Sequence, residues 1–178
     1  MTAKTLPKID VVLPEDELMA RVDDLAERLA PRLQGDWTAI NILVGATPFT
    51  SDLMKALARR DIHPMLDALW LESYRDERES SGRVLVRADI VRPVKDRGVL
   101  LIDDVFDTGR TLAFARSHLM TKGAREVITV ALARKPWAPK GEDDVDFHAF
   151  DAPGRFLVGY GMDDAGLYRG LPYVGALD

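Results

Sequence analysis

Apolar residues recur along the chain at two different spacings, which predict helices in some segments and strands in others. A helix is expected to begin at Pro14, because proline suits a first helical turn and three acidic residues follow it where the helix dipole favours negative charge. One face of this helix is apolar, and the residues that form it are Leu18, Val22, Leu25, Leu29 and Leu33. We interpret this face as one that packs on a core.

Strand and helix patterns alternate over the rest of the chain. Apolar runs predict strands at residues 38–44, 64–71, 84–91, 99–102, 127–133 and 156–160. Helices are predicted at residues 51–60, capped by Thr50 or Ser51, and at residues 111–122, ended by Gly123. This alternation indicates an α/β protein with a mostly parallel central sheet and helices on both faces.

Residues 99–112, VLLIDDVFDTGRTL, carry the most informative pattern. Their apolar start suits a strand buried on both faces of the sheet, and it leads into two adjacent acids, Asp103 and Asp104. A short polar loop and a helix N-terminus follow, and such a junction directs backbone N–H groups and the positive end of a helix dipole toward one point. The loop residues are Asp107, Thr108, Gly109, Arg110 and Thr111.

This junction suits a phosphate, and the paired acids beside it suit the hydroxyls of a sugar or a Mg²⁺ that accompanies a polyphosphate. A phosphorylated sugar would satisfy both parts. The competing interpretation is an ordinary strand-to-helix turn in which Asp107 caps the helix. Turn chemistry, however, does not require two acids at the end of a buried strand.

Composition excludes several classes of protein. The chain has 178 residues, enough for one domain with its own core, and no cysteine, so it holds no disulfide or thiolate. No segment has the length or apolarity of a signal peptide or a membrane span, so we expect a cytoplasmic protein with no membrane partner. The net charge of −5, with acids and bases intermixed, disfavours a nucleic-acid partner.

The sequence from Asp103 to Thr111 closely resembles the signature of type I phosphoribosyltransferases, which bind 5-phosphoribosyl-1-pyrophosphate (PRPP). The segments K-P at 135–136, F-L-V-G-Y-G-M-D at 156–163 and Y-R-G-L at 168–171 resemble the purine end of the hypoxanthine-guanine branch. The resemblance covers most of the chain from about Leu13. It implies one phosphoribosyltransferase domain over residues 1–178, with a core at about 36–135 and a small hood from about 1–15 and 136–178.

The resemblance also implies a reaction and a site. The reaction transfers the phosphoribosyl group of PRPP to N9 of hypoxanthine or guanine, giving IMP or GMP and pyrophosphate in purine salvage. Asp107 is then the acid/base that accepts the proton of purine N7. The implied PRPP-binding residues are Val44, Gly45, Asp103, Asp104, Asp107, Thr108, Gly109, Arg110, Thr111 and Arg169. The implied Mg²⁺ ligands are Asp103, Asp104 and Asp163.

In the implied purine site, Lys135 donates to the 6-oxo group, Phe156 stacks on the base, Leu157 offers its backbone, and Asp163 lies nearby. Without the resemblance, Lys135 would be taken for a solvated surface lysine. Ser73 and Tyr74 begin a polar segment, residues 73–82, that matches the family's mobile lid. The implied partners are PRPP and a 6-oxopurine, and the implied assembly is a homodimer or homotetramer.

Two positions depart from the family pattern. Asp103 stands where the family more often has glutamate, and Val44 replaces a lysine of the pyrophosphate loop. Val44 cannot donate to pyrophosphate or form a salt bridge across a subunit contact. In the family the peptide bond before Gly45 is often cis.

Two other functions remain open at this point. One is a phosphoribosyltransferase for another base, such as xanthine; Lys135 and Phe156 argue against a pyrimidine. The other is a PRPP- or nucleotide-sensing regulator that binds RNA. The acidic balance of the chain, with Asp107, Asp163 and Arg169 retained, disfavours that regulator.

Overall fold

The structure, a computed structural model, describes residues 8–74 and 83–177. The strands are β1 (Asp10–Leu13), β2 (Trp37–Leu43), β3 (Met65–Tyr74), β4 (Arg83–Ala88), β5 (Gly98–Phe106), β6 (Glu126–Arg134), β7 (Phe147–Asp151), β8 (Phe156–Val158) and β9 (Val174–Leu177). The helices are α1 (Glu15–Leu29), α2 (Thr47–Ala58) and α3 (Arg110–Thr121), with short 3-10 helices η1 (Ala30–Arg32) and η2 (Gly141–Asp143).

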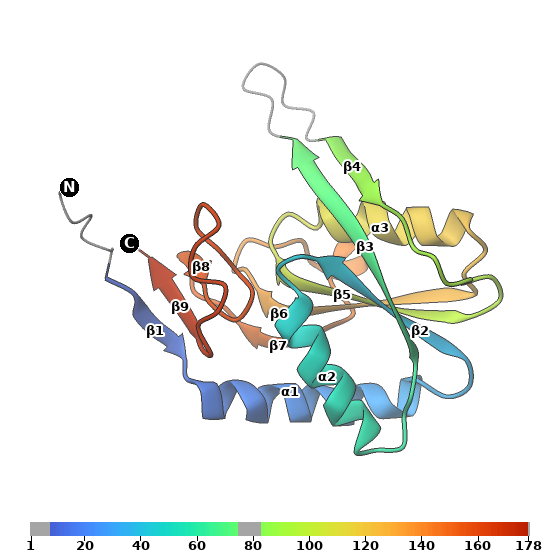
Figure 1. Cartoon of the computed structure of the whole chain (residues 1–178), viewed down its shortest axis with the longest axis horizontal. Helices are drawn as coiled ribbons and strands as arrows, with labels where there is room; N and C mark the ends of the chain where they lie inside the picture. Colours follow the sequence, from blue (N-terminus) through green and yellow to red (C-terminus); the bar gives the residue numbers. More distant parts are fainter. Residues whose placement is uncertain (1–7, 75–82, 178) are drawn as a thin grey trace.

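The central sheet has six strands in the order β4-β3-β2-β5-β6-β7 (Figure 1). All neighbouring pairs are parallel except β3 and β4, which run antiparallel. The prediction of a mostly parallel α/β sheet is therefore confirmed. Because the strands are parallel, the loops after β2, β5 and β6 all leave from the same edge, where ligands bind in such sheets.

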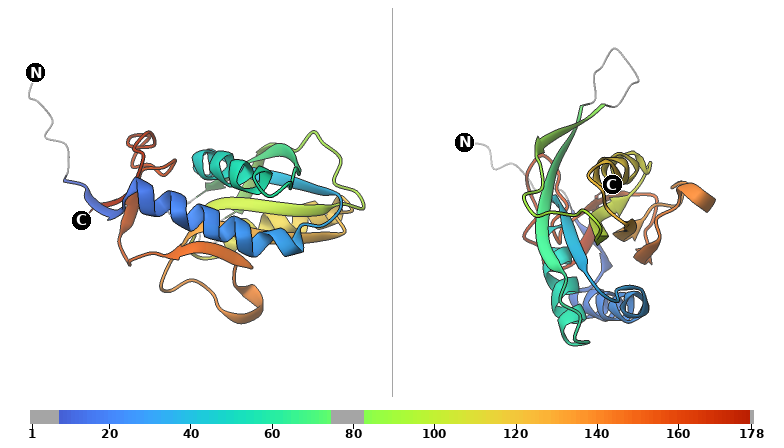
Figure 2. Two further views of the ribbon diagram at one scale, coloured as in Figure 1. Left: turned by 90° about the horizontal axis from the view of Figure 1, so that it is seen from below. Right: turned by 90° about the vertical axis from the view of Figure 1, so that its right-hand side faces the viewer.

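Helices cover both faces of this sheet (Figure 2). Successive residues of β5 point to opposite sides: Leu100 and Ile102 pack with α1 and α2, whereas Val99 and Leu101 pack with α3. This double burial is the physical reason for the continuous apolar run in β5. The apolar face predicted for α1 is likewise buried, at Leu18, Val22, Leu25 and Leu29.

The two ends of the described chain form a second sheet, the hood, in the order β1-β9-β8 (Figure 1). Both pairings are antiparallel. The expected small hood from the chain termini is therefore confirmed. A buried tyrosine links it to the core, since the Tyr160 hydroxyl donates to Asp52 Oδ2 of α2 at 2.7 Å.

Some element boundaries differ from the predictions. Helix α2 begins four residues before the predicted start at Ser51, because Pro48 occupies its first turn. The predicted caps are wrong: the N-cap is Ala46 without a side-chain bond, and the Thr50 hydroxyl donates to Asn41 Oδ1 at 3.1 Å. Strands β1, β7 and β9 were not predicted, because they are four or five residues long and pair with distant segments.

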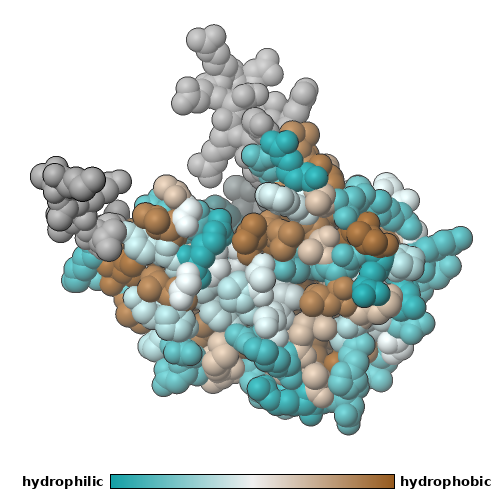
Figure 3. Space-filling model, viewed as in Figure 1, coloured by the Kyte–Doolittle hydropathy of each residue, from teal (hydrophilic) through white to brown (hydrophobic). Residues whose placement is uncertain are grey.

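Hydrophobic residues are scattered among hydrophilic ones on the face shown in Figure 3. In the described part of the chain, no helix combines the length and apolarity needed to cross a membrane.

Replacing Tyr160 with phenylalanine removes the hydrogen bond between hood and core. We expect Tyr160→Phe to lower the free energy of unfolding by about 1 kcal/mol, the usual net value of such a bond. Urea denaturation measures this change. Tyr173→Phe is the matched control, since the Tyr173 hydroxyl makes no hydrogen bond within the described residues. Equal losses of unfolding free energy in Tyr160→Phe and Tyr173→Phe would contradict a stabilising role for the hydrogen bond from Tyr160 to Asp52.

Candidate active site

The loop after β5 leads directly into helix α3. Gly109 is the N-cap of α3 and has a positive φ of 74°, which glycine adopts without steric cost. No side chain caps the helix, so Asp107 does not have the capping role of the competing interpretation. The first N–H groups of α3 are therefore left for another partner. A small cavity of about 50 Å³ lies here, lined by Asp103, Asp107, Thr108, Gly109 and Thr111, among others.

The paired acids lie near the end of β5. Asp103 is buried, and its Oδ1 accepts a hydrogen bond from the Asp104 backbone N–H at 3.0 Å. Burial, reinforced by the neighbouring Asp104 carboxylate, raises the pKa of Asp103 well above its ordinary value. Asp103 therefore takes up a proton more readily than an exposed aspartate, and a bound cation would displace that proton.

The loop after β2 passes close to these acids. A Cβ atom at Gly45 would lie 1.9 Å from Asp104 Oδ2, and one at Gly161 would lie 1.9 Å from the Gly45 carbonyl oxygen. Only glycine allows these contacts, so the loop is held between β5 and the hood. Val44 is exposed, and the cis peptide bond joins Leu43 to Val44, one bond earlier than the resemblance implied.

A cleft of about 470 Å³ opens between the β5 loop and the hood. Its lining includes Asp104, Asp107, Lys135, Phe156, Leu157 and Asp163. The structure thus brings together residues of the implied phosphate, acid/base and purine sites, which are far apart in the sequence. Phe156 is 56% exposed at this cleft, whereas Leu157 is buried.

Lys135 is buried at the end of β6, not solvated on the surface. Its ammonium donates to the backbone carbonyls of Pro153, at 3.3 Å, and Arg155. Burial lowers the pKa of Lys135, and the nearby Asp107 carboxylate opposes that shift. Hydrogen bonds to two carbonyls leave this three-donor group one further N–H for a ligand.

Asp163 and Arg169 form an ion pair at the hood side of the cleft. Their closest atoms, Asp163 Oδ1 and Arg169 Nη2, are 2.5 Å apart, and Arg169 Nη1 donates to the Gly161 carbonyl at 2.6 Å. Within residues 8–74 and 83–177, no three acidic, histidine or cysteine side chains converge as a metal cluster. The predicted set of Asp103, Asp104 and Asp163 is thus not an all-protein cage. Such dispersed carboxylates fit Mg²⁺, which takes most of its ligands from phosphates and water.

A tryptophan that was not predicted also lines the cleft. Trp137 follows Lys135 and Pro136 in the loop after β6, and its indole Nε1–H donates to Asp107 Oδ1. The lone sequence signal was an aromatic residue beside the K-P pair. Aromatic residues in loops are common, so the sequence did not indicate this contact.

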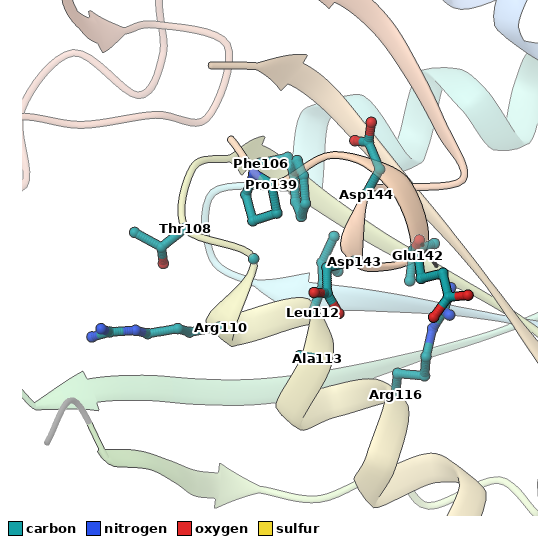
Figure 4. A pocket seen from close by; sticks show the side chains of 12 residues that line it. Phe106, Thr108, Arg110, Leu112, Ala113, Arg116, Pro139, Glu142, Asp143 and Asp144 are labelled. Atoms are coloured by element: carbon teal, nitrogen blue, oxygen red, sulfur yellow. Dashed lines mark hydrogen bonds between the residues drawn. The ribbon is translucent and has the colours of Figure 1, made fainter. Parts of the chain in front are cut away.

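A second cavity, of about 260 Å³, lies between α3 and the loop carrying η2 (Figure 4). Glu142 and Asp143 face it, and the side chains of Thr108 and Arg110 point away from these two acids. The two acids oppose an anion at their end of the cavity, whose lining also includes Thr108, Gly109 and Arg110 at the start of α3.

The remaining site prediction concerns the lid. Ser73 and Tyr74 belong to the end of β3, not to a loop. Residues 75–82 lie outside the described part of the chain.

A parallel sheet with a phosphate-type loop after β5 and a hood over its carboxyl edge defines a nucleotide- or sugar-phosphate-binding class of α/β protein. In agreement, the sequence model of the phosphoribosyl transferase domain matches residues 12–165.

Several relatives match nearly the whole chain. The hypoxanthine-guanine phosphoribosyltransferase of Bacillus subtilis is 35% identical over 168 residues, covering 94% of this chain and 92% of that protein. The crystal structure of a hypoxanthine phosphoribosyltransferase from Staphylococcus aureus superposes with a TM-score of 0.86 at 32% identity, covering 95% of this chain and 91% of that one. The chain belongs to the hypoxanthine-guanine phosphoribosyltransferases of the phosphoribosyltransferase family.

The chain also matches bifunctional proteins. It is 37% identical over 168 residues to the bifunctional protein TilS/HprT of Listeria monocytogenes serotype 4b, and the match covers 94% of this chain. The match spans 26% of the length of that relative.

Replacing Asp103 with asparagine removes a buried ionisable group while keeping its shape. Because the pKa of Asp103 is raised in the folded state, the unfolded chain loses this proton first, and wild-type stability falls as pH rises above about 4. We expect Asp103→Asn to be more stable than the wild type at about pH 8 and similar to it near pH 4. Urea denaturation at both pH values measures the difference. Exposed Asp143→Asn is the control, and a pH-independent gain in Asp103→Asn would contradict this explanation.

Proposed function

We propose that the protein transfers the 5-phosphoribosyl group of PRPP to N9 of hypoxanthine or guanine, forming IMP or GMP and pyrophosphate. The observation that carries the proposal is one cleft that contains both Asp107, beside the phosphate loop, and Lys135 with Phe156. A phosphorylated sugar and a planar 6-oxopurine bound there would meet inside the same cavity. The relatives named above support the same activity.

The phosphoribosyl half of the substrate is assigned to the end of β5 and the start of α3. The 5′-phosphate accepts hydrogen bonds from the loop at residues 107–111, where the α3 N-terminus attracts an anion. Asp103 and Asp104 hold the ribose hydroxyls. Gly45 packs on Asp104, so the backbone of its loop reaches the pyrophosphate side of the same acids. Val44, which has no charge, leaves Arg169 as the cation proposed for pyrophosphate.

The base is assigned to the hood side of the cleft. Phe156 offers an exposed ring for stacking, which contributes about 1–3 kcal/mol per base in nucleic-acid complexes. The Lys135 ammonium donates to the 6-oxo oxygen, which gains negative charge as the base loses its proton. Asp107 accepts the N7 proton as N9 attacks C1 of the ribose.

We propose Mg²⁺ as the metal that accompanies PRPP. Asp103 and Asp104 would hold one Mg²⁺ and Asp163 would hold a second, each together with oxygens of PRPP and water. Bound Mg²⁺ would supply positive charge that offsets the negative charge of the pyrophosphate leaving group. Without it these acids repel PRPP, so a chelator should abolish PRPP binding. The homodimer or homotetramer stays a prediction.

Turnover of PRPP with a panel of bases tests the proposal. We expect hypoxanthine and guanine to be converted, and adenine to react at least about 100-fold more slowly in kcat/KM, because its 6-amino group presents a donor to the Lys135 donor. Xanthine in the same panel tests the alternative base. Adenine turning over faster than hypoxanthine would overturn the role given to Lys135, and no turnover of any base would overturn the proposed function.

Asp107→Asn tests the acid/base role. Asparagine keeps the shape of aspartate but cannot accept a proton, so we expect kcat to fall by about 10²–10⁴-fold with little change in PRPP affinity. Single-turnover measurements isolate the chemical step. Exposed Asp143→Asn should keep wild-type kcat, which controls for loss of one negative charge. A near-normal single-turnover rate in Asp107→Asn would rule out this role.

A further inference from the structure

Trp137 lines the cleft but has no role in the proposed chemistry so far. Its ring is 59% exposed, and it lines the same cleft as Asp107, Lys135 and Phe156. The Lys135 ammonium lies 5.6 Å from the ring centroid, within cation–π range. A half-exposed tryptophan in a cleft that also presents an exposed phenylalanine is an amphipathic surface suited to a flat ligand.

Local geometry holds the indole in place. The Ala138 N–H donates to the Lys135 carbonyl at 3.1 Å, which closes a turn with Pro136 and Trp137 at its two central positions. Proline pre-sets the first of these positions. On the opposite side, a Cβ atom at Gly154 would lie 3.0 Å from Trp137 Cζ3, so glycine leaves room for the ring. Trp137 is therefore supported by its own turn and by the segment before β8.

The hydrogen bond from Trp137 to Asp107 has a consequence for catalysis. A carboxylate has two oxygens, and the indole Nε1–H occupies Oδ1. One bonded oxygen restricts rotation of the carboxylate about its Cβ–Cγ bond, which sets the direction of Oδ2. The Asp107 side chain does not cap α3. Within the described residues, the hydrogen bond from Trp137 is therefore the one that holds the Asp107 carboxylate.

We propose that Trp137 is a positioning residue that orients the Asp107 carboxylate and at the same time forms a wall of the purine site. The inference rests on the proposed function, because it assigns the role of Trp137 in that reaction. The indole fixes Oδ1, so that Oδ2 faces the N7 proton of the base, and the indole ring contacts the bound base or nucleotide. No proton passes through Trp137.

Trp137→Phe keeps an aromatic ring and removes the donor. We expect the single-turnover rate to fall about 10-fold, similar to the loss of other hydrogen bonds that orient a functional group, with KM for PRPP within about twofold of wild type. Trp70→Phe is the matched control, because Trp70 is 47% exposed on β3 and does not line the cleft. Trp70→Phe should keep the wild-type rate. A wild-type rate in Trp137→Phe overturns the inference.

A double-mutant cycle with Asp107→Asn separates positioning from general disturbance. If Trp137 acts through the Asp107 carboxylate, Trp137→Phe should change the rate less than about twofold once Asp107 is asparagine. Full additivity of the two losses overturns the inference. Titration with IMP should change the tryptophan fluorescence of the wild type and of Trp70→Phe but not that of Trp137→Phe. If the fluorescence of Trp137→Phe responds to IMP as the wild type does, Trp137 is not a wall of the purine site.

An indole N–H spectrum tests the contact without any turnover. Trp137→Phe identifies the Trp137 cross-peak by its disappearance, and Asp107→Ala should move that peak while leaving the Trp37 peak in place. A Trp137 peak that stays in place in Asp107→Ala overturns the inference. If the wild type converts no base but the Trp137 peak still moves in Asp107→Ala, only the proposed function is rejected. If the wild type turns over normally and Trp137→Phe has the same rate, only the inference about Trp137 is rejected.

Discussion

The candidate site depends on the close approach of three backbone segments at the carboxyl edge of the central sheet. Asp104 follows the buried run of β5, Gly45 packs directly on its carboxylate, and Gly161 of the hood packs on the Gly45 carbonyl. A Cβ atom at either glycine would lie 1.9 Å from its neighbour, which is closer than atoms pack. The contact therefore packs the hood, the β2 loop and the acid pair directly against one another.

Two ionisable side chains near this contact are buried at a cost to the stability of the free protein. Asp103 is buried with a raised pKa, and Lys135 is buried with a lowered pKa, so burial opposes the charged form of both. The charged form of each side chain would have a lower free energy in water. A site that binds a highly charged ligand needs such groups in place before the ligand arrives, because their reorganisation would otherwise oppose binding. The surrounding core, with α1, α2 and α3 packed on both sheet faces, holds them there.

Val44 and Trp137 lie in the loops that follow β2 and β6. Val44 carries no charge in the loop proposed to contact pyrophosphate, whereas Lys135 and Arg155 line the cleft and Arg169 pairs with Asp163 on its hood side. Trp137 donates a hydrogen bond to Asp107 and adds an aromatic surface to the cleft that also contains Lys135 and Phe156. Both residues lie in loops, and the strands of the sheet determine where these loops lie.

The sequence by itself determined the α/β class, the buried strand β5, the phosphate-type loop after it and the apolar face of α1. These features are local, because the spacing of apolar residues within a strand or helix indicates which of its faces is buried. It did not determine the start of α2, the short strands β1, β7 and β9, the burial of Lys135 or the contact between Trp137 and Asp107. The short strands exist because distant segments pair, as Asp10 does with Ala176, and local periodicity carries no record of the partner. Trp137 and Asp107 are thirty residues apart, and only the parallel alignment of β5 with β6 brings their loops to the same edge.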